Sequence, residues 1–460
     1  MAPPPRTWAD LPTDILTSVV VDRIATLQSY LTVRGVCAAW RSALPPEPPC
    51  LVVSGSGVLH PTSAAFSYPF RLLTLPDDSR CVGACHGWVA IVYTKPRCFY
   101  FHRVPRGDTI TMEVEEEKSY WYRNFHGERI EMDPTKAKGF RQGGKPKPFL
   151  ALFNPVTGRR IELPEHDALD PWKVDRVVFA PNPRRDDFTV VAAFGFNSLA
   201  YVSTRDHHAA AAASWSFSIR EIQCDTAMAD MVYHEEDGGD RVYCLARGGS
   251  DVHVLHVPRG RPSTNPAVTP LHYPGSAVFP PPHDRLSGIL EGAKSLVFCG
   301  GEMYQVWRNT MGGAFRVQLP EPDHWWWRSF LSVREDEVFV LKFDPSRRPC
   351  WRVVGDLGGH AVFVGPGNSA VAVRAEEVPG VRGDCVYWIG MGRIGNRTAS
   401  VFDMRTGKSA PCVPPGDGVG VPVCWYWPGG DAGSSSRKDG QSLQALIKEQ
   451  WVREKMAQLS

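Results

Sequence analysis

Apolar side chains recur every three or four positions in the first part of the chain, which is the period of an amphipathic helix. The first predicted helix starts near Pro12 and Asp14, because proline needs no N–H partner in a first turn and a carboxylate is favoured at the positive end of the helix dipole. A second short helix is predicted over residues 22–30, and a third ends before Pro45. The apolar faces of the first and third helices comprise Leu11, Ile15, Leu16, Val19, Val20, Val33, Val36, Cys37, Trp40 and Leu44.

Three short helices cannot bury so many large apolar side chains in a core of their own, because so small a unit hides too little of its surface. They need a partner surface. The proline-rich linker at residues 45–49 favours an extended, stiff connection, which predicts a detached helical unit over residues 8–44 after a flexible N-terminus at 1–7. The alternative is an ordinary helical cap that packs on the domain that follows.

Beyond Pro49 the hydrophobic pattern changes to short runs of Val, Ile, Phe, Tyr and Trp interrupted by Gly, Pro, Asn and Asp, which is typical of an all-β domain. The candidate strands are 88–93, 149–153, 176–180, 188–194, 241–246, 252–257, 295–299, 303–307, 337–343, 351–354, 361–364, 385–389 and 399–402. Their spacing predicts hairpins in sequence.

A repeated plan of strand, turn, Thr-Gly and strand supports a repeat architecture. It is found at Leu152 to Pro164 around Gly158 and at Val401 to Pro411 around Gly407, and each glycine would supply the positive φ that such a turn needs. Radial repetition of small sheets avoids long exposed edges in a large β domain. We therefore expect a β-propeller over residues 50–425, of about six or seven blades at roughly 40 to 50 residues each.

Three segments lie outside this repeat. Residues 104–146 combine an acidic run with several lysines and predict a mobile loop inserted at a blade edge, whose length indicates either function or disorder. Residues 426–440 are a Gly/Ser linker, and residues 441–460 predict an amphipathic C-terminal helix with Leu443, Leu446 and Trp451 largely on one face. The predicted fold is thus mainly β, with helices at both ends.

Composition narrows the classes of partner. The formal net charge of +2 over 460 residues gives no reason to expect nucleic acid or an anionic membrane as a partner. No apolar signal segment and no run of 18 apolar residues is present, so we expect a protein of the cytoplasm, the nucleus or both. The 12 cysteines are scattered through strand-like runs, which predicts reduced thiols, and the sequon at Asn396 is therefore expected to carry no glycan.

Candidate chemical motifs are few. Residues 390–395, Gly-Met-Gly-Arg-Ile-Gly, spell a dinucleotide-binding fingerprint, but a strand-like run follows where that site needs a helix, so a hairpin loop is predicted. Cys81, Cys85 and His86 lack a fourth ligand at suitable spacing for structural zinc. No nucleophile elbow, phosphate-binding loop or Cys-x-x-Cys is present. We expect no catalytic residue, no metal and no cofactor.

The N-terminal residues resemble an F-box, the module that docks on the Skp1 adaptor of a cullin-RING ubiquitin ligase. The resemblance rests on Leu11-Pro12, Ile15-Leu16, Arg34, Val36-Cys37 and Trp40-Arg41. It implies an adaptor-binding surface formed by Leu11, Pro12, Ile15, Leu16, Leu27, Val36, Cys37 and Trp40.

The long C-terminal region resembles the kelch-like propeller of a large plant F-box family, the KIB-like group. The motifs are His86-Gly-Trp88, Asn154 to Gly158, Met231 to His234 with Val242-Tyr243, and Pro379 to Tyr387. Together the resemblances imply a non-catalytic substrate-recognition subunit of an SCF-type ubiquitin ligase, with Skp1 and, through it, cullin as partners and an unidentified protein as target.

Two alternatives stay open from the sequence. The propeller could act as a binding or inhibitory module that sequesters a partner such as a kinase without any ligase, or its central funnel could be an enzyme pocket. The aromatic cluster at Trp325, Trp326 and Trp327 is either packed between blades or available to the target, and Trp325 and Trp327 are the candidate target-binding residues.

Overall fold

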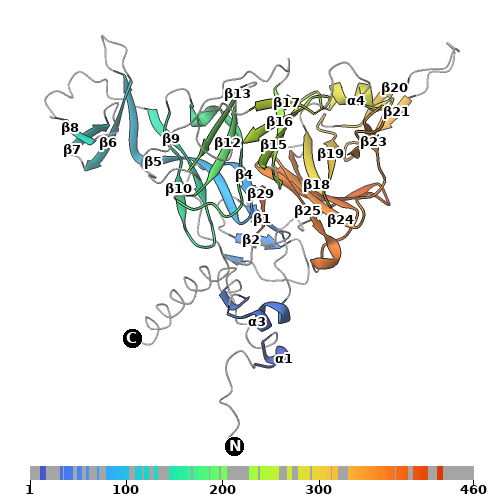
Figure 1. Ribbon diagram of the computed structural model, residues 1–460, viewed down its shortest axis with the longest axis horizontal. Helices are drawn as coiled ribbons and strands as arrows, with labels where there is room; N and C mark the ends of the chain where they lie inside the picture. Colours follow the sequence, from blue (N-terminus) through green and yellow to red (C-terminus); the bar gives the residue numbers. More distant parts are fainter. Residues whose placement is uncertain are drawn as a thin grey trace, which may run out of the picture.

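The computed structural model describes most of the propeller, three parts of the helical segment and several separate strands (Figure 1). The described residues are 11–16, 32–34, 36–44, 49–53, 58–61, 70–71, 79–102, 109–116, 119–123, 129–132, 145–166, 169–185, 187–195, 198–204, 227–236, 239–257, 267–271, 278–290, 293–311, 313–319, 330–378, 380–391, 397–412 and 422–427. The predicted C-terminal helix at 441–460 lies outside these residues, as do the N-terminus at 1–7 and most of both linkers.

Five blades surround a common axis, and their innermost strands contact one another in a closed ring. In chain order these strands are β4 (Arg80–Cys85), β11 (Val174–Phe179), β14 (Met228–Glu236), β18 (Lys294–Cys299) and β25 (Asn368–Arg374). Within the described residues, this arrangement replaces the six or seven blades expected from the sequence. The expectation failed because the stretches between innermost strands are longer than 40 to 50 residues, and because strands at both ends of the domain form a separate sheet.

Blades one to three are antiparallel sheets. Blade one continues outward from β4 through β5 (Trp88–His102), β9 (Lys145–Phe153) and β10 (Arg160–Glu162). Blade two adds β12 (Thr189–Phe194) and β13 (Ser198–Ser203), and blade three adds β15 (Gly239–Ala246), β16 (Val252–Val257) and β17 (Ala267–Pro270).

Blades four and five carry additional features. Blade four consists of β18, β19 (Glu302–Arg308), β22 (Val338–Phe343) and β23 (Trp351–Val353), and between β19 and β22 the chain forms a hairpin of β20 (Phe315–Gln318) and β21 (Phe330–Val333). Blade five runs outward from β25 through β24 (His360–Gly365), β26 (Cys385–Met391), β27 (Arg397–Asp403) and β28 (Lys408–Pro411). Its β24 and β26 are parallel.

A sixth sheet fills the wedge between blades five and one. Its order is β29 (Pro422–Tyr426), β1 (Cys50–Val53), β2 (Val58–Pro61) and β3 (Phe70–Arg71), so a strand from the end of the domain pairs with one from its beginning. Leu51 of β1 lies opposite Trp425 of β29. Strand β29 also contacts β4 of blade one and β24 of blade five, so this sheet closes the ring on its outer side.

The core is divided into clusters that lie between neighbouring sheets, because each inner sheet is covered on both faces. Val177 and Val190 of blade two pack with Trp88 of blade one, while Val191 on the opposite face of blade two packs with Met231 of blade three. The alternation arises because successive side chains of a strand point to opposite faces of its sheet. It explains why the strands are rich in apolar residues at consecutive positions.

The predicted strands are confirmed, with boundaries that differ by at most one residue where the prediction extends past a strand. The two Thr-Gly turns are also confirmed. Gly158 has φ 70° and Gly407 has φ 62°. In both turns an Asx side chain accepts backbone N–H groups two and three residues ahead: Asn154 Oδ1 accepts at 3.1 and 2.9 Å, and Asp403 Oδ1 at 3.0 and 3.2 Å.

The insertion at 104–146 differs from the predicted loop. It contributes β6 (Thr109–Glu116), β7 (Ser119–Arg123) and β8 (Arg129–Met132), which extend the sheet of blade one from the far end of β5. The physical reason lies in the alternation of Ile110, Met112 and Val114 with polar residues, a strand pattern that the neighbouring glutamates obscure.

The helical elements lie at opposite sides of the molecule. Figure 1 shows α1 (Thr13–Ile15) and α3 (Ala38–Ala43) at its lower end, below β2, whereas α4 (His283–Ile289) and the β20–β21 hairpin lie along its upper edge. Short 3₁₀ turns precede β11 (Pro171–Lys173) and follow β25 (Ala375–Glu377). No helix within the described residues is long and apolar enough to cross a membrane.

Candidate functional site

The described parts of the helical segment are short helices with local caps. In α1, Leu16 N donates to Pro12 O at 3.0 Å, so the proline carbonyl starts the helix as the sequence predicts. In α3, the Cys37 sulfur accepts the Trp40 N–H at 3.4 Å and acts as the N-cap. Leu44 ends the helix in an extended conformation, one residue before the linker prolines.

The residues of the adaptor-binding surface that the F-box resemblance implies differ in how deeply they are buried. Ile15 and Val36 are large apolar residues that remain 42% and 50% exposed, and Pro12 is exposed beside them in sequence. Leu16 and Trp40 retain only 1% and 9% exposure. Leu11 and Cys37 are intermediate, and Leu27 lies outside the described residues.

The buried residues of the helices belong to the same apolar cluster as the propeller's closing sheet. Leu16, Trp40 and Leu44 share this cluster with Cys50 of β1 and Tyr426 of β29. The helices are therefore packed onto the domain that follows, as in the alternative of a helical cap, while Ile15 and Val36 stay on the surface. Leu16 and Trp40 act in this chain as packing residues.

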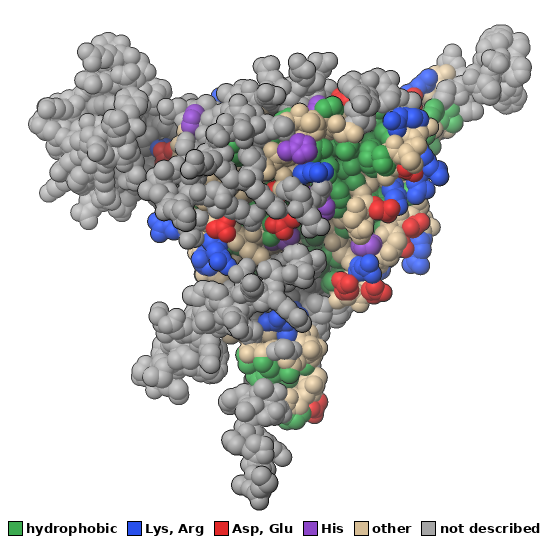
Figure 2. Space-filling view, in the orientation of Figure 1, with side chains coloured by type: hydrophobic (Ala, Val, Ile, Leu, Met, Phe, Trp, Pro, Cys, Tyr) green, Lys and Arg blue, Asp and Glu red, His purple; other side chains and the backbone are tan. Residues whose placement is uncertain are grey.

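The opposite side of the molecule carries other exposed apolar side chains. Met311 and Phe330 are 61% and 49% exposed, in and next to the β20–β21 hairpin, and Ile289 at the end of α4 is 38% exposed. The hairpin is tied to α4, because Arg285 Nη1 donates to Gln318 O at 2.9 Å. Figure 2 shows hydrophobic side chains gathered in the upper right of the molecule, where α4, β20 and β21 lie. The predicted target-binding residues Trp325 and Trp327 are outside the described residues.

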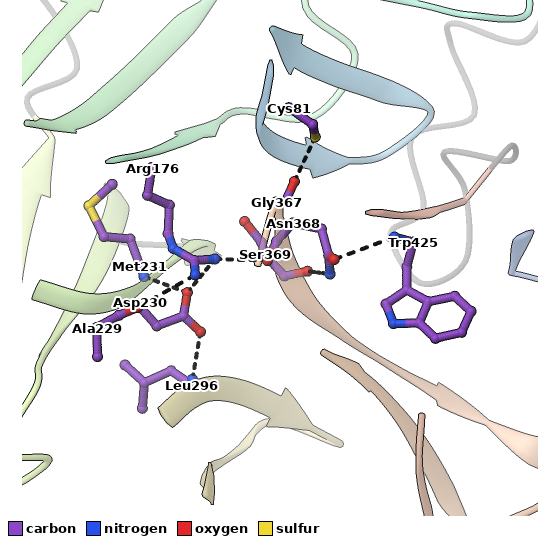
Figure 3. Close-up of polar contacts among 10 residues, drawn as sticks. All are labelled: Cys81, Arg176, Ala229, Asp230, Met231, Leu296, Gly367, Asn368, Ser369 and Trp425. Carbon is purple, nitrogen blue, oxygen red and sulfur yellow. Dashed lines mark hydrogen bonds and ion pairs between the residues drawn. The ribbon is translucent and has the colours of Figure 1, made fainter. Parts of the chain in front are cut away.

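A buried ion pair joins the blades at the propeller axis (Figure 3). Arg176 Nη1 of β11 lies 2.9 Å from Asp230 Oδ1 of β14, with side chains 13% and 0% exposed. The other carboxylate oxygen, Oδ2, accepts the Leu296 N–H of β18 at 2.9 Å, and Arg176 Nη1 also donates to Asn368 O of β25 at 2.8 Å. Four of the five innermost strands are thus joined through one carboxylate and one guanidinium.

The electrostatics of this pair favour a structural role. Burial raises the pKa of the Asp230 carboxyl, while Arg176 and the backbone N–H groups of Leu296 and Met231 oppose that rise. The arrangement specifies how the blades meet.

The fifth blade connects the same axis to blade one and the closing sheet. Cys81 Sγ of β4 donates to Gly367 O at 2.8 Å, and Trp425 N of β29 donates to Asn368 Oδ1 at 3.4 Å. The strands approach closely: a Cβ on Gly83 would lie 2.1 Å from Val177 O of the neighbouring blade. Neighbouring innermost strands are therefore in direct contact around the axis.

The candidate chemical motifs have structural explanations. Gly390 and Met391 end β26, and they pair with Thr398 and Arg397 of β27, so the glycine-rich stretch connects two antiparallel strands and lacks the helix that a dinucleotide site needs. Cys81 is engaged with the backbone of Gly367. Among the residues that the structure describes, no group of three metal-ligating side chains comes together.

A protein-family model identifies the propeller. The model of the KIB1-4 beta-propeller family matches residues 144–413. No curated protein matches the sequence.

Similar solved structures include a puromycin-hydrolyzing peptidase of Mycobacterium tuberculosis, with 13% identity over 70% of this chain and a TM-score of 0.23, and this chain covers 54% of that peptidase. Dihydro-heme d1 dehydrogenase NirN in complex with DHE has 12% identity over 85% of this chain and 79% of the other, with a TM-score of 0.27. AofleA from Arthrobotrys oligospora has 11% identity over 71% of this chain and 87% of the other, with a TM-score of 0.21.

Structural similarity this low carries no argument about activity. The family model, in contrast, spans more than half of the chain and includes four of the innermost strands, β11, β14, β18 and β25. A propeller of this kind is consistent with a protein-interaction module. The chain belongs to the KIB1-4 beta-propeller family.

Proposed function

We propose that this protein is the substrate-recognition subunit of an SCF-type ubiquitin ligase, in which the N-terminal helices dock on a Skp1-like adaptor and the propeller binds a protein target. The observation that carries the proposal is the exposure of Ile15, at the end of α1, and of Val36, just before α3, in a segment that lies outside the propeller. Exposed side chains of this size, on a segment that resembles an F-box, suit an adaptor interface.

The positions of the helical segment and of the β20–β21 hairpin support separate surfaces for the adaptor and the target. The helices lie on one side of the molecule, and α4 with the β20–β21 hairpin lies on the other (Figure 1). An adaptor bound to the helices would leave the exposed Met311 and Phe330 available to a target. The chain itself makes no bond in this proposal, because proximity of the target's lysines to a charged ubiquitin carrier provides the rate enhancement.

Co-purification with Skp1 tests the adaptor interface. Removal of the whole helical segment is a poor test, because Leu16, Trp40 and Leu44 cover Cys50 and Tyr426 of the closing sheet. The better variant is Ile15→Ala combined with Val36→Ala, which truncates the two exposed side chains.

The expected loss of Skp1 affinity follows from the exposed fractions of Ile15 and Val36. Complete burial of an Ile or Val side chain contributes about 1.5–3 kcal/mol, and Ile15 and Val36 have 42% and 50% of their surface left to bury. Each therefore contributes about 1 kcal/mol, and the double variant should weaken Skp1 binding about 30-fold. The matched control, Met311→Ala with Val353→Ala, removes exposed apolar side chains from the propeller and should leave Skp1 binding unchanged. Equal Skp1 affinity of the double variant and the wild type would refute docking through these residues.

The second candidate function is a ligase-independent propeller that sequesters a partner such as a kinase. The burial of Leu16 and Trp40 within the chain favours it, because these side chains are withdrawn from any adaptor. Absence of Skp1 binding by the full chain, together with a target whose activity changes while its abundance is insensitive to proteasome inhibition, would establish this function in place of the first.

A further inference from the structure

A guanidinium and an indole are stacked at the boundary between blades four and five. Arg308 is the last residue of β19, and its backbone N–H donates to Ala293 O at 3.0 Å, next to the start of β18. Its guanidinium carbon lies 5.0 Å from the centroid of the Trp388 ring on β26. The stack therefore bridges two blades, on the side of the molecule from which α4 leads into β18.

The charge of Arg308 has no counter-ion among the residues that the structure describes. Burial alone lowers the pKa of its guanidinium to about 10, and no carboxylate opposes that effect. Two other partly buried arginines differ. Arg176 pairs with Asp230, and Arg80 donates to the carbonyl oxygens of Val174 and Trp172 at 2.7 and 3.1 Å.

The indole adds a second donor without an acceptor. Trp388 Nε1 is buried and has no hydrogen-bond partner in the part of the chain that the structure describes. A buried polar group without a partner costs free energy. The stacked pair combines this buried indole N–H with an arginine that is partly buried and has no ion-pair partner among the described residues.

The backbone beside the stack is adapted to leave it room. A Cβ on Gly390 would lie 2.3 Å from Trp388 Cζ3 and 2.9 Å from Arg308 Nη1. Only glycine at this position allows the ring and the guanidinium to occupy their places. The nearby backbone thus preserves the geometry of the pair.

We propose that Arg308 and Trp388 form a binding site for a single oxyanion, either a carboxylate or a phosphate group, in which the guanidinium supplies the charge and Nε1 supplies a second hydrogen bond. Arginine suits such groups because its planar N–H donors match two oxygens at once. Two sources share this chemistry: an acidic or phosphorylated side chain of a bound protein, and a free phosphate. The site is independent of the Skp1 proposal, because neither residue lies in the helical segment.

Binding is measured on the full chain by isothermal titration calorimetry at constant ionic strength. The probes are inorganic phosphate, acetyl-phosphoserine N-methylamide and acetyl-glutamate N-methylamide. Wild type should bind at least one of them saturably. Arg308→Met and Trp388→Phe should each weaken that binding by about 10- to 100-fold, the value of a hydrogen bond to a charged group. The phenylalanine keeps the aromatic ring and removes only the N–H.

Two matched variants act as controls. Trp351→Phe removes another buried indole N–H that lacks a partner among the described residues, and Arg316→Met removes an exposed arginine of the β20–β21 hairpin. Both should bind the probes as wild type does. Tighter binding of a blocked amino acid than of inorganic phosphate would identify a protein side chain as the source, and the reverse order would identify a free anion.

A stability measurement separates a ligand site from a structural stack. Because Arg308 is unpaired, Arg308→Met without ligand should melt at or above the wild-type temperature, and added probe should no longer raise its melting temperature. Two results would overturn the proposal: no saturable binding of any probe by the wild type, or binding that Arg308→Met and Trp388→Phe leave unchanged. A melting temperature of Arg308→Met well below that of the wild type would also overturn it, by assigning the residue to the framework.

Discussion

Asp230→Ala should destabilise the whole propeller, because it leaves a charge uncompensated at the axis. Asp230 is 0% exposed and its partner Arg176 is 13% exposed. The substitution removes the ion pair and also the acceptor for the backbone N–H groups of Met231 and Leu296, at 2.8 and 2.9 Å. Loss of one partner from a buried pair costs about 3–5 kcal/mol, a large part of the 5–15 kcal/mol by which a native domain is stable.

The assay is urea unfolding followed by tryptophan fluorescence, completed as a double-mutant cycle. Arg176→Met together with Asp230→Ala should cost less than the sum of the two single substitutions, by about 1 to 3 kcal/mol, because neither charge is then left alone. Glu376→Ala is the control: its pair with Arg374 spans 3.6 Å between side chains 78% and 57% exposed, and such pairs contribute less than about 1 kcal/mol. A loss below about 1 kcal/mol for Asp230→Ala, or strict additivity in the cycle, would refute the role assigned to this pair.

Three further predictions concern glycines and thiols. Gly83→Ala places a Cβ 2.1 Å from a carbonyl oxygen of β11 and should prevent native assembly, whereas Gly313→Ala, with no atom within 4 Å, should leave the melting temperature unchanged. Gly407→Ala forces alanine into a φ of 62° and should cost about 1–2 kcal/mol in urea unfolding, a loss that would be absent if the turn could rearrange. Burial raises the pKa of the Cys299 thiol to about 12, so this thiol should resist iodoacetamide at pH 8 until the chain unfolds, as mass spectrometry of the labelled peptide would show. Because the pKa of this thiol is higher in the folded than in the unfolded chain, its contribution to the free energy of unfolding is complete below about pH 8.5 and is progressively lost as the pH rises toward 12. Rapid labelling of the native protein at pH 8 would contradict the raised pKa.

Local patterns predicted the strands and turns because both depend on neighbouring residues. Runs such as Val252–Val257 are rich in β-branched residues, and polar or turn-forming residues mark their ends. The Thr-Gly turns need only an Asx residue and a glycine at fixed spacing. The blade number was not accessible in this way. It depends on pairings between distant segments, such as β1 with β29 and the parallel pair β24 and β26, which no local period encodes.

The candidate sites were predictable only in part. The helical period identified the apolar residues of the N-terminal segment, but it could not show which side chains face the chain's own closing sheet. Leu16 and Ile15 are adjacent in sequence, yet one is buried and the other is exposed. No sequence pattern marks Arg308 and Trp388, because an arginine at the end of a strand gives no signal that it has no ion-pair partner.

The pairing of β1 with β29 also determines when the molecule can be completed during synthesis. Strand β1 leaves the ribosome early, but its partner Pro422–Tyr426 is translated only after all five blades. At about 5–20 residues per second, the N-terminal helices wait tens of seconds for Cys424 and Tyr426, on which their buried side chains depend. Such a long-range contact slows folding, because closing the loop between β1 and β29 costs conformational entropy before the contact can stabilise the fold. A nascent chain truncated before β29 therefore lacks Cys424 and Tyr426 from the apolar cluster that buries Leu16 and Trp40, and it exposes apolar surface that the finished protein hides.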